Sequence, residues 1–366
     1  MDTQFKKRGY LWPFSFLYGL GVAIRNRFFD WGILPSEEFN IPIISVGNIT
    51  VGGTGKTPHI EYLIRLLSPQ YRVAVLSRGY KRKSKGFVLA NENSTDMELG
   101  DEPFQIKRKF PDLTVAVDAN RRRGIKKLME LTPKIDVILL DDAFQHRYVK
   151  PGISILLTDF NRIIYKDSLL PVGRLREPAF ERMRAGMVIV TKCPLDIKPI
   201  DFRIIQKHLD LFTYQSLYFS TYAYKELQPV FPEHIAFPKC LRQEKEHDAI
   251  LLVTGIASSH TIKQQVELSA KKVVELNFSD HHKFTPKDIQ RIMHKLASLK
   301  QKNAFIVITE KDAARLLHMS NLPPELKSKL YYLPVEVEFL QNQQEDFNKK
   351  IEGYVRKNRR NSTLSK

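Results

Sequence analysis

One short segment limits the fold of this chain more than any other. Residues 52–57, with the sequence GGTGKT, follow the apolar run 41–46 and precede the helix-compatible stretch 59–67. Glycines let backbone N–H groups turn toward a phosphate, a lysine brings charge to the terminal phosphates, and a threonine hydroxyl can hold Mg²⁺. A strand, a phosphate loop and a helix in this order predict a nucleoside-triphosphate site. The residues predicted to bind the nucleotide are Thr50, Val51, Gly52, Gly53, Thr54, Gly55, Lys56 and Thr57.

The loop departs from the strict P-loop pattern at its first position. That pattern has a glycine five residues before the Gly-Lys pair, where this chain has Thr50. The glycines at 52, 53 and 55 still supply inward-facing amides in the expected strand and helix context. The alternative interpretation is a glycine-rich turn without a ligand.

Length and composition exclude several classes of protein. With 366 residues and 43% hydrophobic content, the chain can bury a core and form two domains. Its two cysteines, Cys193 and Cys240, exclude a disulfide scaffold or zinc cluster and suit a reducing compartment. The net charge of +18 fits nucleic acid, an anionic membrane or an acidic substrate. No nucleic-acid-binding motif accompanies that charge, so we predict no nucleic-acid partner.

The N-terminal segment predicts contact with a membrane surface. The aromatic and apolar stretch 10–24 follows Lys6-Lys7-Arg8 and precedes Arg25 and Arg27. About 15 apolar residues are too few to span a bilayer, which requires ~20. Basic flanks and aromatic residues favour a helix in the interface of an anionic membrane. A buried N-terminal helix and a secretory signal are the alternatives.

The remaining chain predicts an α/β fold with two lobes. Short apolar runs alternate with longer charged, helix-compatible stretches, which favours a mostly parallel, P-loop NTPase-like sheet flanked by helices. The proline-rich region 222–247 interrupts this alternation, so we expect a second, smaller α/β lobe after about residue 221. The expected division is a membrane-associated segment 1–40, a kinase-like core 41–220, and a lobe 221–366 with a disordered basic tail from about 356. The expected strands are 73–76, 113–117, 137–140, 153–157, 187–190, 249–253, 272–276 and 305–308.

Two acids follow one of these apolar runs. The run 137–140 ends in Asp141 and Asp142, which predicts carboxylates for Mg²⁺ at the edge of the sheet beside the phosphate loop. Gln145 and His146 follow directly, an unusual density of polar groups after a buried strand. A plain loop start is the alternative for the acids.

Four other segments carry candidate functional groups. The loop after strand 73–76 holds Arg78, Lys81 and Arg82, which could contact phosphate or form a solvated charge run. The segment 100–103 resembles a helix start, because the helix dipole favours a carboxylate such as Asp101 at an N-terminus. The segments 170–178, which includes Arg176 and Glu177, and 279–284, which includes His281, are polar site candidates or surface loops. Neighbouring histidines on an extended chain point apart, so a base or hydrogen-bonding role is favoured over zinc.

Taken together, seven short motifs resemble one family, the tetraacyldisaccharide 4'-kinases of lipid A assembly. The resemblance extends from the N-terminal apolar segment to about residue 317. It implies transfer of the ATP γ-phosphate to the 4'-hydroxyl of a tetraacylated glucosamine disaccharide 1-phosphate, at the cytoplasmic face of a Gram-negative inner membrane. The motifs are GGTGKTP, RGY, GDEP, DDAFQHR, LREP, DHH and TEKDA.

The resemblance also implies roles for individual residues. The resemblance implies that Lys56 and Thr57 bind Mg²⁺–ATP, and that Asp141 or Asp142 and Glu177 lie near the metal. Asp101 and His281 align with a carboxylate–imidazole pair, which would orient the sugar hydroxyl and accept its proton. This replaces the interpretation of Asp101 as a helix start alone. Residues expected to contact the substrate are Arg78, Lys81, Arg82, Gln145, His146 and Arg176.

One departure and two rival functions stay open at this stage. Ala143 replaces the glycine that the family carries after the acidic pair, and an ordinary backbone is expected there. A regulatory NTPase that acts on a protein or membrane partner is one rival, although Pro194 after Thr191-Lys192 disfavours guanine. A non-catalytic nucleic-acid-binding protein is the other. No obligate protein partner is inferred.

Overall fold

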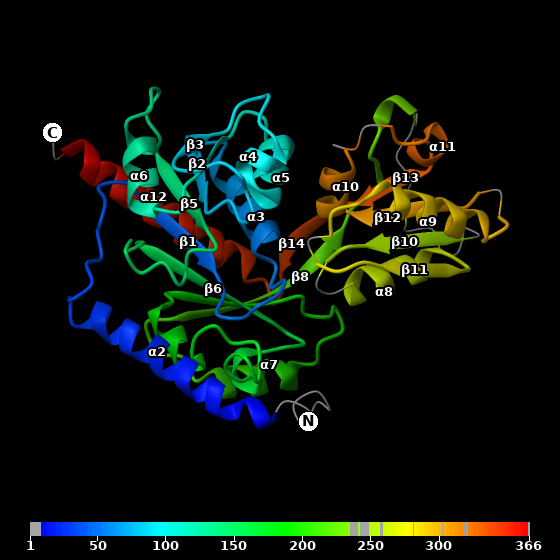
Figure 1. The fold of residues 1–366 in the computed structure, drawn as a ribbon. Coiled ribbons are helices and arrows are strands. Elements are labelled where there is room, and N and C mark those ends of the chain that lie inside the picture. Colours follow the sequence, from blue (N-terminus) through cyan, green and yellow to red (C-terminus); the bar gives the residue numbers. More distant parts are fainter. Residues whose placement is uncertain are drawn as a thin grey trace. The chain divides into compact units, whose positions relative to one another are not determined.

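The computed structural model describes residues 9–234, 241, 249–256, 259–280, 282–301, 303–317, 319 and 321–364. The chain forms two compact units, one of residues 1–222 with 337–366 and one of residues 223–336 (Figure 1). The chain passes between the units within two strands, β8 and β14.

The first unit is built on a nine-stranded sheet, in the order β14-β8-β7-β6-β1-β5-β2-β4-β3. β1 pairs in parallel with β5 on one side and β6 on the other, so the strand order reverses at the strand that feeds the phosphate loop. Only β3 is antiparallel among the pairs whose register is known in the described chain. The strands are β1 (Ile43–Gly47), β2 (Val73–Ser77), β3 (Val88–Leu89), β4 (Thr114–Val117), β5 (Val137–Asp141), β6 (Ile153–Asp159), β7 (Met187–Thr191), β8 (Ser216–Tyr224) and β14 (Val335–Phe339).

Helices cover both faces of this sheet because alternate strand residues are apolar on opposite sides. Val75 and Ile155 pack in one core with α3, α5 and α12, whereas Leu76 packs with α6 and Leu156 with α7. The helices of this unit are η1 (Gly9–Leu11), α2 (Trp12–Asp30), α3 (Lys56–Leu67), α4 (Asp96–Leu99), α5 (Asp101–Lys109), α6 (Arg121–Met129), η2 (Ile164–Lys166), η3 (Ala179–Arg184), α7 (Pro199–Leu209) and α12 (Gln344–Leu364).

The second unit holds a five-stranded sheet in the order β11-β10-β12-β13-β9, parallel except for β9. Leu251 and Ile306 face a core with α9, α10 and α11, and Leu252 and Val307 face α8. Its elements are β9 (Gln228–Pro229), η4 (Pro232–His234), β10 (Ile250–Thr254), α8 (His260–Ser269), β11 (Val273–Asn277), α9 (Pro286–Ala297), β12 (Phe305–Thr309), α10 (Glu310–Leu316), α11 (Pro324–Lys327) and β13 (Leu330–Leu333).

The α/β fold class is confirmed, and each expected strand is present within two residues of its expected ends. The C-terminal part differs from the expectation, because residues 337–366 belong to the first unit rather than to the second lobe. Phe347, Ile351 and Val355 recur at helical spacing and are buried in the first core. Helix α12 continues to Leu364, where a disordered tail was expected from about 356.

The N-terminal helix α2 has an inverted distribution of polarity. Its buried residues are Ser15, Asn26 and Phe29, so two of the three are polar. Most of its large apolar side chains face outward, including Trp12 and Phe16, which are 65% and 58% exposed. Within the described chain, no helix is both long enough and apolar enough to cross a bilayer.

Candidate active site

The phosphate loop connects β1 to α3 through two left-handed glycines. Gly52 has φ +111° and Gly55 has φ +90°, conformations that a residue with a side chain rarely adopts. A Cβ on Gly55 would also lie 2.6 Å from the hydroxyl oxygen of Tyr222. Gly55 is the N-cap of α3, so the loop ends at the positive end of the helix dipole.

Three side chains bind three consecutive carbonyl oxygens of this loop. Lys192 Nζ donates to Gly53 O, Thr191 Oγ1 donates to Thr54 O at 2.9 Å, and His59 Nδ1 bonds Gly55 O at 2.8 Å. In a trans peptide the N–H group points opposite to the carbonyl. The N–H groups of residues 54, 55 and 56 are therefore directed away from these donors, toward the side on which a phosphate would bind.

His59 is a neutral, buried residue within this arrangement. A carbonyl acceptor at Nδ1 requires the proton on that nitrogen, so Nε2 accepts from the Ser220 hydroxyl at 3.1 Å. Burial lowers the pKa of His59 to about 4, against the smaller opposing effect of the Gly55 carbonyl. His59 thereby connects the loop to β8 without adding a charge.

The predicted acidic pair lies at the end of β5, the strand beside β1. Asp141 is buried, accepts from Ser77 Oγ at 3.2 Å, and its Oδ1 has no hydrogen-bond partner in the described chain. Burial and then the neighbouring charges of Glu102 and Asp142 raise its pKa to about 7, while Lys56 and Arg121 oppose the rise. A buried carboxylate with an open oxygen fits a cation such as Mg²⁺.

Asp142 joins the loop to the acidic pair. Its Oδ1 lies 3.7 Å from Lys56 Nζ and 3.2 Å from Arg176 Nη2. It has φ +47°, a conformation that aspartate tolerates, whereas Ala143 is not among the described residues with positive φ. The ordinary backbone expected at Ala143 is confirmed, and the strained position is one residue earlier.

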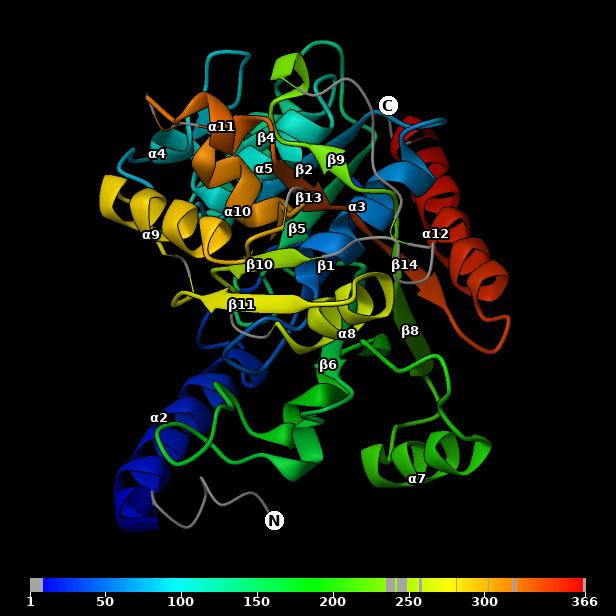
Figure 2. The same cartoon turned by 90° about the vertical axis from the view of Figure 1, so that its right-hand side faces the viewer.

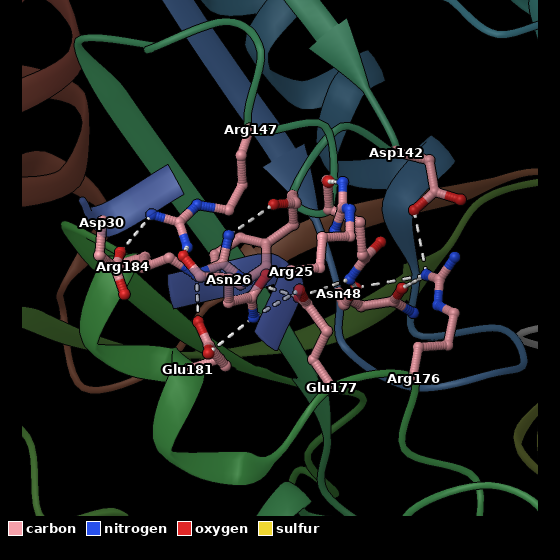
Figure 3. A network of polar contacts seen from close by, with 12 residues as sticks. Arg25, Asn26, Asp30, Asn48, Asp142, Arg147, Arg176, Glu177, Glu181 and Arg184 are labelled. Carbon is pink, nitrogen blue, oxygen red and sulfur yellow. Dashed lines mark hydrogen bonds and ion pairs between the residues drawn. The ribbon is translucent and has the colours of Figure 1, made fainter. Parts of the chain in front are cut away.

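Glu177 lies in a polar network rather than in an open carboxylate site (Figure 3). Arg184 pairs with it at 2.6 Å, and Asn26 and Gln145 each donate to it at 3.3 Å. No three His, Cys, Asp or Glu side chains gather as a metal site in the described part of the chain. A metal role for Glu177 therefore stays a prediction, and its observed contacts connect α2 to the loop after β5.

The network continues from Glu177 to the phosphate loop. Gln145 donates to Asn48 O at 2.7 Å, and Arg176 bonds both the Asn48 side chain and Asp142. The Asn48 amide donates to Thr54 Oγ1 at 2.6 Å. Arg176 and Gln145 thus lie beside the loop and hold it, and their contact with the substrate stays a prediction.

The other predicted substrate residues have different surroundings. His146 has a buried Nε2 without a partner in the described chain, and burial followed by nearby arginines, Arg78 among them, lowers its pKa to about 4. Arg82 instead donates to Gly86 O at 2.6 Å and to Val117 O, so it holds its own loop. The Lys81 ammonium lies 5.5 Å from the Tyr80 ring centroid.

The two predicted acid–base residues belong to different units. Asp101 is the first residue of α5, after Gly100 at φ +88°, so glycine occupies the capping position. Asp101 still lies where the helix dipole stabilises a carboxylate. His281 lies outside the described residues.

Several contributors escaped the sequence analysis. Asn48, His59 and Thr191 contact the phosphate loop, and Arg121 is buried with Nη2 donating to Asp141 O at 3.2 Å. Asn48 and His59 lie close to the GGTGKT segment in the sequence, so their positions could have indicated a contact with the loop. Thr191-Lys192 was considered only as a nucleobase loop, and Arg121 is masked by two neighbouring arginines.

A doubly wound sheet with a phosphate loop at the strand-order reversal and carboxylates on the adjacent strand defines a P-loop nucleotide-binding protein. Residues 8–356 match the family model described as Tetraacyldisaccharide-1-P 4'-kinase. The tetraacyldisaccharide 4'-kinase of Bacteroides thetaiotaomicron is 54% identical over 100% of this chain and 98% of its own length. That of Flavobacterium johnsoniae is 45% identical over 96% and 98%.

A solved structure agrees with these sequence relatives. It is the apo form of LpxK from Aquifex aeolicus in complex with ATP, with a TM-score of 0.69 and 28% identity, over 95% of this chain and 99% of that one. This chain belongs to the tetraacyldisaccharide 4'-kinase family, kinases of lipid A biosynthesis.

The hydrogen bond from Thr191 to Thr54 O yields a first prediction. Thr191→Val should weaken ATP binding about fivefold, since one hydrogen bond contributes about 1 kcal/mol and its loss lets the peptide turn. Thr191→Ser should bind ATP normally in isothermal titration calorimetry. Thr221→Val is the matched control, because it removes a buried 2.7 Å bond to Cys193 O outside the loop. An equal loss of affinity in the control would contradict the assignment.

The neutral state of His59 yields a second prediction. Its folded pKa of about 4 lies below the usual 6.5, so its contribution to stability is present above pH ~6.5 and is lost as the pH falls toward 4. Between pH ~7 and ~5 this loss is about 2 kcal/mol. In urea unfolding, the free energy of unfolding should fall by about 2 kcal/mol less between pH ~7 and ~5 in His59→Gln than in the wild type. The exposed His208→Gln is the control, and identical slopes in all three proteins would refute the prediction.

Proposed function

We propose that this chain transfers the γ-phosphate of ATP to the 4'-hydroxyl of a tetraacylated glucosamine disaccharide 1-phosphate, with Mg²⁺ as cofactor. Membership of the kinase family supports the reaction class. The observation that carries the nucleotide assignment is the binding of three consecutive loop carbonyls from one side. Three amides directed to the other side form a preorganised anion site, which needs little rearrangement when a polyphosphate binds.

The phosphate loop and the acidic pair are proposed to bind ATP and its metal ion. The loop amides and Lys56 bind the phosphates, and Thr57 with Asp141 or Asp142 would hold Mg²⁺, which uses one or two carboxylates plus phosphate oxygens. When bound, the metal neutralises charge on the transferred phosphoryl group. The open Oδ1 of Asp141 supports this choice. Lys56, already 3.7 Å from Asp142, stays oriented by that carboxylate.

The acceptor side is assigned to Asp101 with His281 as the group that orients the 4'-hydroxyl and accepts its proton. The position of Asp101 at the start of α5 supports an ionised carboxylate there. Arg78 is the preferred residue for the substrate's anionic group, because it is exposed and its guanidinium stays charged. His146, which burial keeps neutral, is proposed as its neighbour in that contact. Arg82 is less favoured, since its donors already hold backbone carbonyls.

The protein is proposed to act at the cytoplasmic face of the inner membrane, held there by α2 without an obligate protein partner. The outward-facing aromatic residues of α2 support contact with lipid, because amphipathic rings favour the bilayer interface. A lipid substrate makes such contact necessary for encounter.

A product assay tests this function. Purified protein in detergent receives labelled ATP and the acylated disaccharide 1-phosphate, and lipid chromatography detects the product. Lys56→Ala should lower product formation at least ~100-fold, because the terminal phosphate loses its only lysine in the loop. Asp101→Asn should lower kcat strongly with little change in the KM for ATP.

A control variant and two other outcomes complete the product assay. Lys126→Ala removes a lysine that pairs with Glu37 at 2.7 Å and should keep full activity. Release of free phosphate without labelled lipid would favour a regulatory NTPase instead. Unchanged kcat in Asp101→Asn would exclude Asp101 from proton transfer.

A further inference from the structure

Exposed apolar side chains gather in a second stretch that the proposed function leaves unexplained. In the described chain, only five of the large exposed ones lie outside residues 10–33 and 180–214, namely Val51, Tyr80, Leu89, Met97 and Leu268. The first stretch is α2 and its flanks. From the second we define the η3–α7 patch as Phe180, Met183, Ile200, Ile204, Phe212 and Tyr214. We propose that this patch is a second membrane-contact element, which inserts into the lipid bilayer beside α2.

Hydrogen bonds join the patch to α2. Asn26 of α2 donates to Glu181 of η3 at 2.7 Å, and Arg184 holds the same carboxylate at 2.6 Å. The Tyr214 hydroxyl donates to Met183 O at 2.6 Å, which fixes the loop after α7 to η3. Both views show α2 and α7 on the same side of the first unit (Figures 1 and 2). The two apolar stretches therefore lie at the same end of the first unit.

The chemistry of the patch fits a lipid bilayer. Phe212 and Tyr214 stack with ring centroids 5.6 Å apart, and Tyr214 is 60% exposed although its hydroxyl is satisfied. Amphipathic aromatic rings of this kind favour the headgroup boundary. Helix α7 is apolar on two faces, since Ile205 and Leu209 are buried while Ile200 and Ile204 are exposed. An exposed apolar face of this extent marks an interaction surface.

The charges around α7 favour an anionic lipid surface. Lys198, Arg203 and Lys207 are exposed beside the two isoleucines. Of the nearby acids, Asp210 is paired with Arg182 at 3.9 Å, whereas Asp201 accepts from the backbone Lys198 N at 3.3 Å and keeps its charge. Asp196 is also exposed, so three cations lie beside two acids, Asp196 and Asp201. Phosphate headgroups attract such a cluster.

A second contact changes what the membrane does to the enzyme. A single interfacial helix fixes the depth of a protein but lets the protein rotate about the helix axis. A second apolar element to one side of that axis fixes the orientation as well. The inference rests on the proposed membrane contact of α2, and it adds that the bilayer sets the direction in which the phosphate loop faces.

Quenching by lipids tests both elements separately. Full-length protein is mixed with vesicles of phosphatidylethanolamine and phosphatidylglycerol that carry bromine on their acyl chains. The two native tryptophans, Trp12 and Trp31, report on α2. In a background with both replaced by phenylalanine, Phe212→Trp reports on the patch, and Leu89→Trp, outside both stretches, is the control. We expect quenching of the wild type and of Phe212→Trp, and none of Leu89→Trp.

The outcomes separate this inference from the proposed function. Quenched native tryptophans with an unquenched Phe212→Trp variant would overturn the patch and leave α2 standing, whereas no quenching in either protein would overturn both. Ile200→Ser with Ile204→Ser should weaken vesicle binding about tenfold and leave activity on detergent-dispersed substrate unchanged. A lipid-free dimer that the same two substitutions dissociate would assign the patch to a second copy of the chain and overturn the proposal.

Discussion

The nucleotide site depends on how the peptide groups of the phosphate loop are held. Three neighbouring strands contribute. Thr191 ends β7 and Lys192 follows it, Asp159 at the end of β6 pairs with Lys192 at 2.8 Å, and Ser220 within β8 bonds His59. The loop carbonyls are satisfied by buried side chains when the protein folds. The amides therefore keep one direction before any phosphate arrives, and electrostatic stabilisation by preorganised dipoles is large in a site that excludes water.

The same site is connected to α2 through buried charge. Glu177 and Glu181 both pair with Arg184, and both accept hydrogen bonds from the Asn26 amide. Gln145 connects Glu177 to the loop, because its amide donates to Glu177 and to Asn48 O. Removing one partner of such a network leaves an uncompensated buried charge, which is strongly destabilising. This explains why α2 turns Asn26 inward. The helix proposed to contact the bilayer and the loop proposed to bind the nucleotide are parts of one hydrogen-bonded structure.

Local patterns in the sequence were sufficient for much of this fold. Apolar runs located the strands, and the GGTGKT segment with Asp141 located the phosphate loop and its acidic neighbour, because these signals lie within a few residues. Contacts between distant residues were not predictable, such as Asn26 with Glu181 or Thr191 with Thr54. The return of residues 337–366 to the first unit was also missed, because the stripe of Phe347, Ile351 and Val355 does not indicate which core it joins.

The central claim is that the amides of residues 54–56 bind the phosphates of ATP because their carbonyls are held on the opposite side. A crystal structure of this chain with Mg²⁺ and a non-hydrolysable ATP analogue tests it most directly. We expect phosphate oxygens within hydrogen-bond distance of those three amides, with the bonds to Thr191, His59 and Lys192 intact. A polyphosphate bound elsewhere, or a loop whose carbonyls have left these side chains, would contradict the account.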